Sequence, residues 1–145
     1  MAYQIVVENE YATVRYEPEH AYIYHTFHQP IRGEIFRKTM NTGLDALIHN
    51  HATRWLSDDR LNAEFTPEDV EFALIDWGPR AAQGGWKYWA LVVPENIAGR
   101  AGMTDIISAF FELGVRVMVF SDLEKARAWL INVQEDEQPT SYHAA

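Results

Sequence analysis

Three consecutive side chains at the end of an apolar run could carry chemistry: Ser57, Asp58 and Asp59. A serine hydroxyl can receive a phosphate from a kinase, and neighbouring carboxylates can bind a hard cation or polarise a substrate. The same residues also suit a solvated turn, in which an aspartate bonds to the local backbone. Because adjacent side chains of an extended strand point to opposite faces, we expect the two carboxylates to act separately. We favour the solvated turn and keep the three residues as a candidate phosphorylation or loop site.

The six histidines lack the spacing of a zinc site. Zinc requires three or four converging ligands, and His25 and His28, three residues apart in an expected strand, face opposite sides. No His-Glu-x-x-His spacing occurs, and the absence of cysteine excludes thiolate ligands, thiol catalysis and disulfides. We therefore predict no metal and no cofactor, with the histidines at the surface or at strand ends. A hydrolase that combines Asp58, Asp59 and a histidine remains a third alternative.

A second candidate site, for an anion, consists of Gly99, Arg100 and Gly102. These residues precede a helix expected over residues 103–113, and the free amide groups at a helix N-terminus attract negative charge. The pattern also fits a plain loop between a strand and a helix. Two further glycines at 84 and 85 precede a strand, which is the wrong context for a phosphate loop.

Aromatic side chains are more abundant than a small core requires, with five Trp, seven Tyr and seven Phe. They could fill the space between a sheet and its helices, line an apolar cavity or form a dimer contact. The candidate residues for an apolar pocket are Tyr22, Tyr24, Phe36, Met40, Trp77 and Trp89.

The overall charge argues against nucleic acid as a partner. Acids outnumber bases by 21 to 12, which gives a formal net charge of −9, and the bases do not cluster. No apolar run approaches the roughly 20 residues of a membrane-spanning helix, and no signal peptide is visible. We expect a cytoplasmic protein, whose charge gives no support to membrane association.

The first part of the chain has the pattern of strands followed by a helix. Residues 5–7, 11–16 and 21–28 are β-branched or alternate between apolar and polar positions, and their short connections favour antiparallel pairing. Apolar residues at helical spacing follow over residues 30–50, and a short strand over residues 54–56 leads into Ser57.

From Thr66 onward, helices and strands alternate. Thr66 and the proline after it begin a helix, which Pro79 is expected to kink or end. Residues 86–93 and 115–120 are predicted to be buried strands. Ser121 is expected to cap the final helix, as the hydroxyl of a capping box.

This order predicts an α/β fold. Strands that alternate with helices form parallel sheets with right-handed crossovers, whereas the first strands pair antiparallel. We therefore expect a mixed β-sheet with antiparallel N-terminal strands, a parallel βαβαβα C-terminal half and about four helices. A single domain should cover residues 1–133, and residues 134–145 read as a polar, flexible tail.

Several stretches resemble the SpoIIAA-like family, which belongs with the STAS domains. They read W-L-S-D-D-R-L-N from residue 55, T-P-E-D from 66, W-G-P-R from 77, K-Y-W-A-L-V-V-P from 87, and F-F-E-L-G-V-R-V-M-V-F-S-D-L-E-K-A-R-A-W-L from 110. The resemblance covers most of the chain and consists of framework residues. It implies the STAS fold, and the likeness of this group to Sec14-type domains implies association with an apolar ligand or a membrane.

STAS domains that act as antagonists carry an Asp-Ser-x-Gly motif at a helix start, where phosphate from a kinase releases the partner. Here Ser57 precedes the acids, no glycine follows, and the helix is postponed to Thr66, so the motif is missing. We expect a non-enzymatic STAS/SpoIIAA-like binding or regulatory domain that forms a homodimer through edge strands and surplus aromatic residues. The alternative is a binding protein for an apolar small molecule or lipid, with peripheral membrane association.

Overall fold

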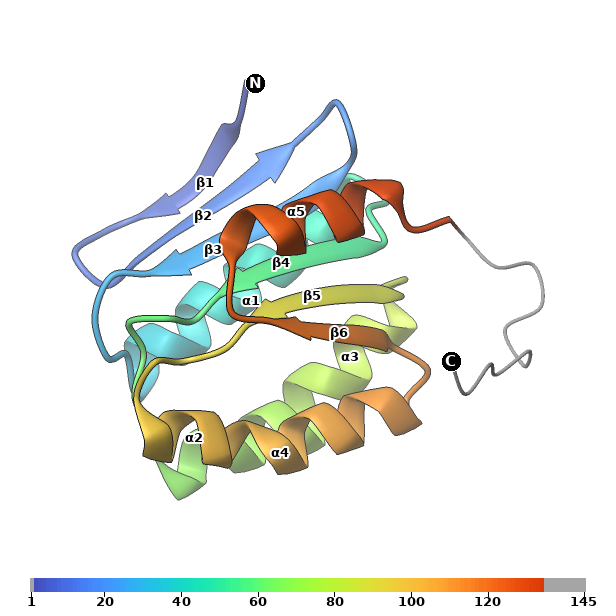
Figure 1. Ribbon diagram of the computed structural model, residues 1–145. Coiled ribbons are helices and arrows are strands. Elements are labelled where there is room, and N and C mark those ends of the chain that lie inside the picture. The colour runs from blue at the N-terminus through green and yellow to red at the C-terminus, as the bar shows by residue number, and fades with distance from the viewer. Residues whose placement is uncertain (1, 135–145) are drawn as a thin grey trace.

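One six-stranded sheet, in which the strands follow their order along the chain, organises the computed structural model, which describes residues 2–134 (Figure 1). The strands β1 to β3 pair antiparallel, and β3 to β6 pair parallel. The predicted mixed sheet is thereby confirmed. The strands are β1 (Gln4–Glu8), β2 (Ala12–Glu17), β3 (Tyr22–Phe27), β4 (Arg54–Asp58), β5 (Tyr88–Val92) and β6 (Arg116–Phe120).

Helices cover both faces of the sheet, as Figure 1 shows. The helices are α1 (Glu34–His49), α2 (Pro67–Glu71), the π-helix η1 (Phe72–Trp77), α3 (Gly78–Gln83), α4 (Ile97–Glu112) and α5 (Leu123–Asn132). This arrangement confirms the α/β class. None of the helices in residues 2–134 is both long enough and apolar enough to cross a bilayer.

The two faces of the sheet bury different residues because side chains alternate along each strand. We call the face that carries Trp55 and Trp89 the tryptophan face; α1, η1, α3 and α4 pack on it. The opposite α5 face carries Leu56 and Ala90, which pack against α5. The three crossovers between parallel strands all pass over the tryptophan face, so the sheet grows in one direction.

The sequence prediction for this helical segment is correct at its start, and of the two outcomes expected at Pro79 the structure shows an interrupted helix rather than an ended one, with α3 closing at Gln83 before the two glycines. The Thr66 Oγ1 accepts a hydrogen bond from the backbone N–H of Asp69 at 3.1 Å, as the capping pattern predicts. The helix does not end near Pro79, because a π-turn precedes the proline: the N–H of Gly78 donates to the carbonyl of Ala73, five residues back. The wider turn accommodates a residue that would clash in a regular α-helix.

The start of α4 also differs from the prediction. The helix begins at Ile97 rather than at residue 103, because the side chain of Asn96 caps it by accepting from the N–H of Gly99 at 2.8 Å. The glycines at 99 and 102 therefore lie within the helix. A Cβ on Gly99 would lie 3.0 Å from the backbone carbon of Ala63, so this glycine allows the helix to approach the chain.

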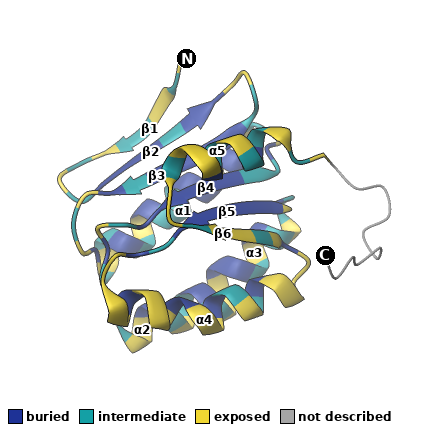
Figure 2. Ribbon diagram, in the orientation of Figure 1, coloured by how far each residue is buried: buried dark blue, intermediate teal, exposed yellow. Residues whose placement is uncertain are grey.

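The strand predicted over residues 115–120 is confirmed as β6, but the prediction that it is buried is wrong. β6 is the edge strand of the sheet, and Met118 and Val119 are 44% and 46% exposed. Figure 2 shows this contrast between β6 and the buried strands β4 and β5. The final helix also begins one residue later than expected, since Asp122 rather than Ser121 is its cap and accepts from the N–H of Lys125.

The structure describes the predicted domain except for Met1. Gln134 is the one residue of the predicted tail within the described range, and its carbonyl accepts a hydrogen bond from the Tyr88 hydroxyl at 3.3 Å. The remainder of the tail prediction, residues 135–145, lies outside the described residues.

Candidate functional site

A cavity lies between the tryptophan face and the helices that cover it. The centre of a water-sized molecule can move within about 40 Å³ of it, which is room for a few waters. Side chains from β3, β4, β5, α1, η1 and α4 enclose this space. They are His25, Phe27, Phe36, Met40, Trp55, Ser57, Asp59, Phe65, Phe72, Ala73, Trp77, Trp86, Trp89, Met103, Ile106 and Phe110.

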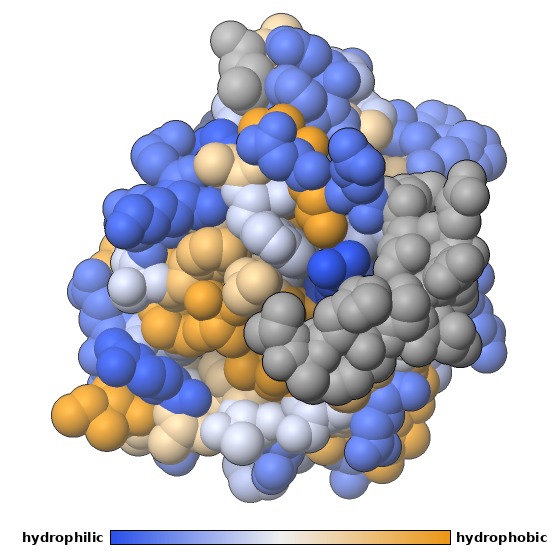
Figure 3. Space-filling model, turned by 45° about the vertical axis from the view of Figure 1, so that its right-hand side comes forward, coloured by the Kyte–Doolittle hydropathy of each residue, from blue (hydrophilic) through white to orange (hydrophobic). Residues whose placement is uncertain are grey.

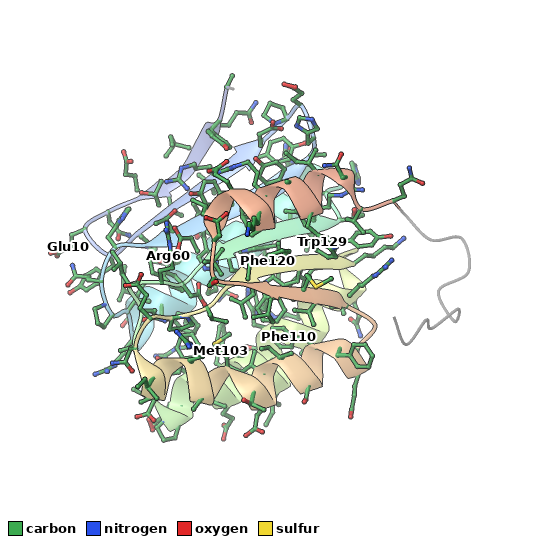
Figure 4. All side chains as sticks on the ribbon, viewed as in Figure 1. Glu10, Arg60, Met103, Phe110, Phe120 and Trp129 are labelled. Atoms are coloured by element: carbon green, nitrogen blue, oxygen red, sulfur yellow. The ribbon has the colours of Figure 1, made fainter. Side chains whose placement is uncertain are left out.

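The cavity reaches the surface between α1 and the chain that leads into η1. Among its lining residues, Met40, Phe65 and Phe72 are half-buried and the others are buried. Two of the buried residues, Met103 and Phe110, point from α4 toward the sheet in Figure 4. A ligand would therefore enter past three flexible or rotatable apolar side chains.

Three polar residues form the floor of the cavity: His25, Ser57 and Asp59. His25 and Ser57 are direct partners in the parallel pairing of β3 with β4. Asp59 follows β4 by one residue, and its backbone N–H donates to the carbonyl of Val92 at 3.0 Å, which fixes its position. Asp59 and Ser57 are each only 3% exposed. The floor is thus a set of polar groups buried among aromatic rings.

The hydrogen bonds of His25 define its tautomer. The indole Nε1–H of Trp55 lies 2.9 Å from His25 Nδ1, and His25 Nε2 lies 2.7 Å from Asp59 Oδ1. An indole N–H can only donate, so Nδ1 must be the accepting nitrogen and carries no proton. The imidazole is therefore neutral, with its single proton on Nε2 directed at the carboxylate.

Ser57 is separate from this histidine–aspartate pair. Its Oγ accepts a hydrogen bond from the indole Nε1–H of Trp89 at 2.9 Å. Both ring nitrogens of His25 already have partners, so neither can remove a proton from the Ser57 hydroxyl. The three residue types of a catalytic triad are present here without the serine–histidine bond that a triad requires.

Four tryptophans make the walls of the cavity rigid. Trp55, Trp77 and Trp86 pack edge to face or tilted, with ring centroids 5.3–6.2 Å apart. Trp86 and Trp89 are 5.4 Å apart in a similar geometry. Two indole groups donate to backbone carbonyls, Trp77 to Met40 and Trp86 to Tyr88. Because the ring positions and the N–H groups are both fixed, the cavity is preformed.

Two glycines allow the helices to approach these rings. A Cβ on Gly43 of α1 would lie 2.7 Å from Cη2 of Trp55, and a Cβ on Gly78 would lie 2.5 Å from Cε1 of Phe110. Both distances are too short for any larger residue unless the ring moves. The π-turn of η1 completes this wall, since it places Phe72, Ala73 and Trp77 on the cavity side.

The predicted loop site is divided between the two faces of the sheet. As expected for adjacent residues, Asp58 and Asp59 point in opposite directions: Asp59 meets His25 and Asp58 meets Arg60. Arg60 binds both oxygens of Asp58, and these hydrogen bonds raise the pKa of the Arg60 guanidinium above its ordinary value. The expected solvation of this turn is wrong, because Asp58 and Asp59 are each 3% exposed, whereas the expected local bond is present: the backbone N–H of Arg60 donates to Asp58 Oδ1 at 3.3 Å. Burial of Ser57 beneath Trp89 keeps its hydroxyl out of reach of a kinase in the folded protein.

The predicted pocket is partly assembled. Phe36, Met40, Trp77 and Trp89 line the cavity, but Tyr22 and Tyr24 lie on the α5 face. Along β3, both tyrosines alternate with His25, so their side chains point to the α5 face while that of His25 points to the tryptophan face.

On the α5 face, Tyr22 belongs to a polar cluster with Tyr3 and Arg127. Its hydroxyl lies 3.2 Å from that of Tyr3 and accepts from Arg127 Nη1 at 3.1 Å. Burial, reinforced by the bond with Tyr3, raises the pKa of Tyr22 above its ordinary value of 10.0, although Arg127 acts in the opposite direction.

The candidate anion site is not assembled. The N–H of Gly99 already donates to Asn96, and Arg100 Nε donates to the carbonyl of Pro94 at 3.2 Å. Gly102 faces open space one turn further along the helix. No amide groups converge with a free guanidinium at this position among the described residues.

His20 is the one histidine of residues 2–134 that lies within ligand distance of two carboxylates, those of Glu17 and Glu19. The buried Glu17 accepts from both the backbone N–H and Nδ1 of His20, at 2.6 and 3.1 Å. These bonds close the turn between β2 and β3, which accounts for the cluster without a metal. His25 contradicts the prediction that the histidines lie at the surface or at strand ends.

Sequence reasoning missed the central pair of the site, His25 with Asp59, which are 34 positions apart. One local signal was present: His25 stands between Ile23 and Phe27 in the inward phase of β3, where an apolar residue is expected. A polar residue at such a position requires a buried partner.

The fold and the cavity together define an α/β domain with a preformed aromatic pocket and a polar floor. No family model, no curated protein and no solved structure matches the chain. The site must therefore be interpreted from its own geometry.

Proposed function

We propose that this chain is a non-enzymatic binding domain that holds one small, largely apolar molecule in the tryptophan-lined cavity. The observation that carries the proposal is the combination of fixed aromatic walls with a few polar groups at one end, which is the usual composition of a small-molecule site. A core that served only packing would have no reason to bury a carboxylate beside an open space, since this costs stability.

The hydrogen bonds within the polar floor support a binding function over a catalytic one. A serine nucleophile needs a base within hydrogen-bond distance, and His25 uses both nitrogens for Trp55 and Asp59. Asp58, which a hydrolase would need beside Asp59, is on the other face of the sheet and paired with Arg60.

The small volume of the cavity disfavours a long fatty acid, and a single ring would enter only if the half-buried side chains of Met40, Phe65 and Phe72 moved aside, since a cavity that holds benzene has about 150 Å³. With about 40 Å³ for the centre of a water-sized molecule, a long acyl chain would fit only if α1 or η1 moved away from the sheet. Small apolar ligands are thus a better match than the lipid that the Sec14-type likeness implies.

Binding can be tested with benzyl alcohol, a neutral probe of one ring and one polar group. We expect saturable quenching of Trp fluorescence and a rise in Tm, because a ligand of the folded state stabilises it. The variant Ala73→Leu fills the cavity and should weaken binding at least about tenfold. Ala128→Leu, on the exposed side of α5, is the matched control and should bind as the wild type does. Equal binding by both variants would place the probe elsewhere and refute the proposal.

The exposed edge strand supports homodimer formation as a second proposal. β6 leaves one edge of its backbone unpaired, and Met118 and Val119 beside it are half exposed. Figure 3 shows hydrophobic surface on this side of the molecule. Light scattering should give twice the 16.7 kDa of one chain, and Val119→Lys should give the mass of one chain. A wild-type mass of one chain would refute it.

Kinship with the SpoIIAA-like family and a cytoplasmic location stay predictions. The mixed sheet and the order of its elements are compatible with that family. Cell fractionation would test the location.

A further inference from the structure

The polar floor of the cavity has a charge and a hydrogen-bonding character that restrict which molecule can bind. This inference rests on the proposed function, since it concerns the ligand of the same cavity. We infer that the ligand carries a protonated amine, attached to a small aromatic or apolar body, and that Asp59 receives this group.

The first step is the charge of the floor. His25 is neutral, because Nδ1 accepts from the indole of Trp55, so it cannot balance the carboxylate of Asp59. The nearest guanidinium along the chain, that of Arg60, pairs with Asp58 on the opposite face. Within residues 2–134, the neutral His25 is the hydrogen-bond partner of the Asp59 side chain, and no lysine or arginine contacts this carboxylate. The floor therefore carries a negative charge that no fixed cation neutralises.

The second step is the free acceptor. Asp59 Oδ1 accepts from His25, whereas Oδ2 has no hydrogen bond within residues 2–134. The residue lines the cavity and is 3% exposed, so this oxygen can gain a donor only from what enters the cavity. Oδ2 is not among the fully enclosed polar atoms that lack a partner within residues 2–134, so it keeps contact with the space of the cavity, and a ligand N–H can take the place of water at this oxygen.

The third step is the chemistry of the walls. The N–H groups of Trp55, Trp77, Trp86 and Trp89 all donate to atoms of the protein, so none is available to a ligand. The rings instead present their π-systems, which attract cations. A carboxylate ligand would find the Ser57 hydroxyl as its one side-chain donor and would face Asp59. An ammonium group would meet an acceptor and several aromatic rings.

Three probes of similar shape and different charge test this inference on the full chain: benzylamine, benzyl alcohol and benzoate. We expect benzylamine to bind at least about tenfold tighter than benzyl alcohol, and benzoate to bind weakest. If none of the three binds, the proposed function fails. If benzyl alcohol binds and benzylamine binds no tighter, or if benzoate binds tightest, this inference fails and the proposed function stands.

Two variants assign the preference to one carboxylate. Asp59→Asn should reduce the ratio of benzylamine to benzyl alcohol affinity to about one. Asp58→Asn removes the same charge from the neighbouring residue, which faces away from the cavity, and should leave the ratio unchanged. The ratio is measured within each variant, so a loss of stability does not alter its meaning. A ratio that persists in Asp59→Asn would overturn the assignment, and if that variant does not fold, the ranking of the three probes on the wild type still decides.

Discussion

Replacement of His25 by leucine should be among the most damaging single changes on the tryptophan face. The substitution leaves two buried polar groups without partners, the indole N–H of Trp55 and the carboxylate Oδ1 of Asp59. Each orphaned group costs about 1–3 kcal/mol, and a charged group costs more. Leucine restores some apolar contact, so we expect a loss of about 2–6 kcal/mol in the free energy of unfolding. A domain of this size has a total of about 5–15 kcal/mol.

Urea denaturation followed by far-UV circular dichroism measures this loss without relying on tryptophan emission, which the mutation itself perturbs. The control is His28→Leu, the same substitution at the exposed end of β3. His28 is itself exposed and its bond to Thr13 Oγ1 at 2.7 Å is the one side-chain hydrogen bond lost, so the cost should be about 1 kcal/mol, below that at His25. If the two variants were equally stable, the buried hydrogen bonds of His25 to Trp55 and Asp59 would contribute nothing to the free energy of unfolding. That result would refute the reasoning about the cavity floor.

Three further predictions concern the helices and the α5 face. Gly43→Ala should destabilise the fold by about 1 kcal/mol, because overpacking against Trp55 exceeds the gain in helix propensity. Gly102→Ala, with open space around its Cβ, should stabilise the fold by about 0.5–1 kcal/mol; chemical denaturation measures both variants, and a gain in stability at Gly43 would contradict the packing argument. Thr66→Ala removes the cap of α2 and should cost about 1 kcal/mol by the same measurement, and an unchanged midpoint would show that the cap is dispensable. The folded state holds the Tyr22 proton more tightly than the unfolded state does, so the contribution of Tyr22 to the free energy of unfolding is complete below pH 10 and is lost as pH rises above 10. Tyr22→Phe should flatten this loss of stability at alkaline pH. An identical pH dependence of stability in the variant would refute the role given to Tyr22.

Several elements could be predicted from local sequence because their causes are local. The alternation over residues 11–16 and 21–28, the cap and proline at the start of α2, and the apolar runs of β5 and β6 each act within a few residues. Alternation of helices with strands then constrains the topology to parallel pairs joined by crossovers, and the parallel pairing of β3 to β6 bears this out.

The exposure of β6 and the start of α4 could not be predicted, because they depend on how elements pack together and a local sequence pattern holds no information about that packing. The apolar run of β6 looks the same whether the strand is central or at an edge, and only the absence of a seventh strand among the described residues leaves Met118 exposed. The glycines near residue 100 read as a loop because helix propensity disfavours glycine. Close contact of Gly99 with Ala63 and the Asn96 cap outweigh that preference.

The sequence by itself determined which residues can form strands and helices, and it placed a histidine in the inward phase of β3. Only the tertiary structure decided that this histidine meets Asp59 and Trp55 and that Tyr22 and Tyr24 face away from the cavity. The physical reason is that the register of parallel strands is set by packing between segments far apart in the chain. A shift of one residue between β3 and β4 would separate His25 from Ser57 and remove the polar floor.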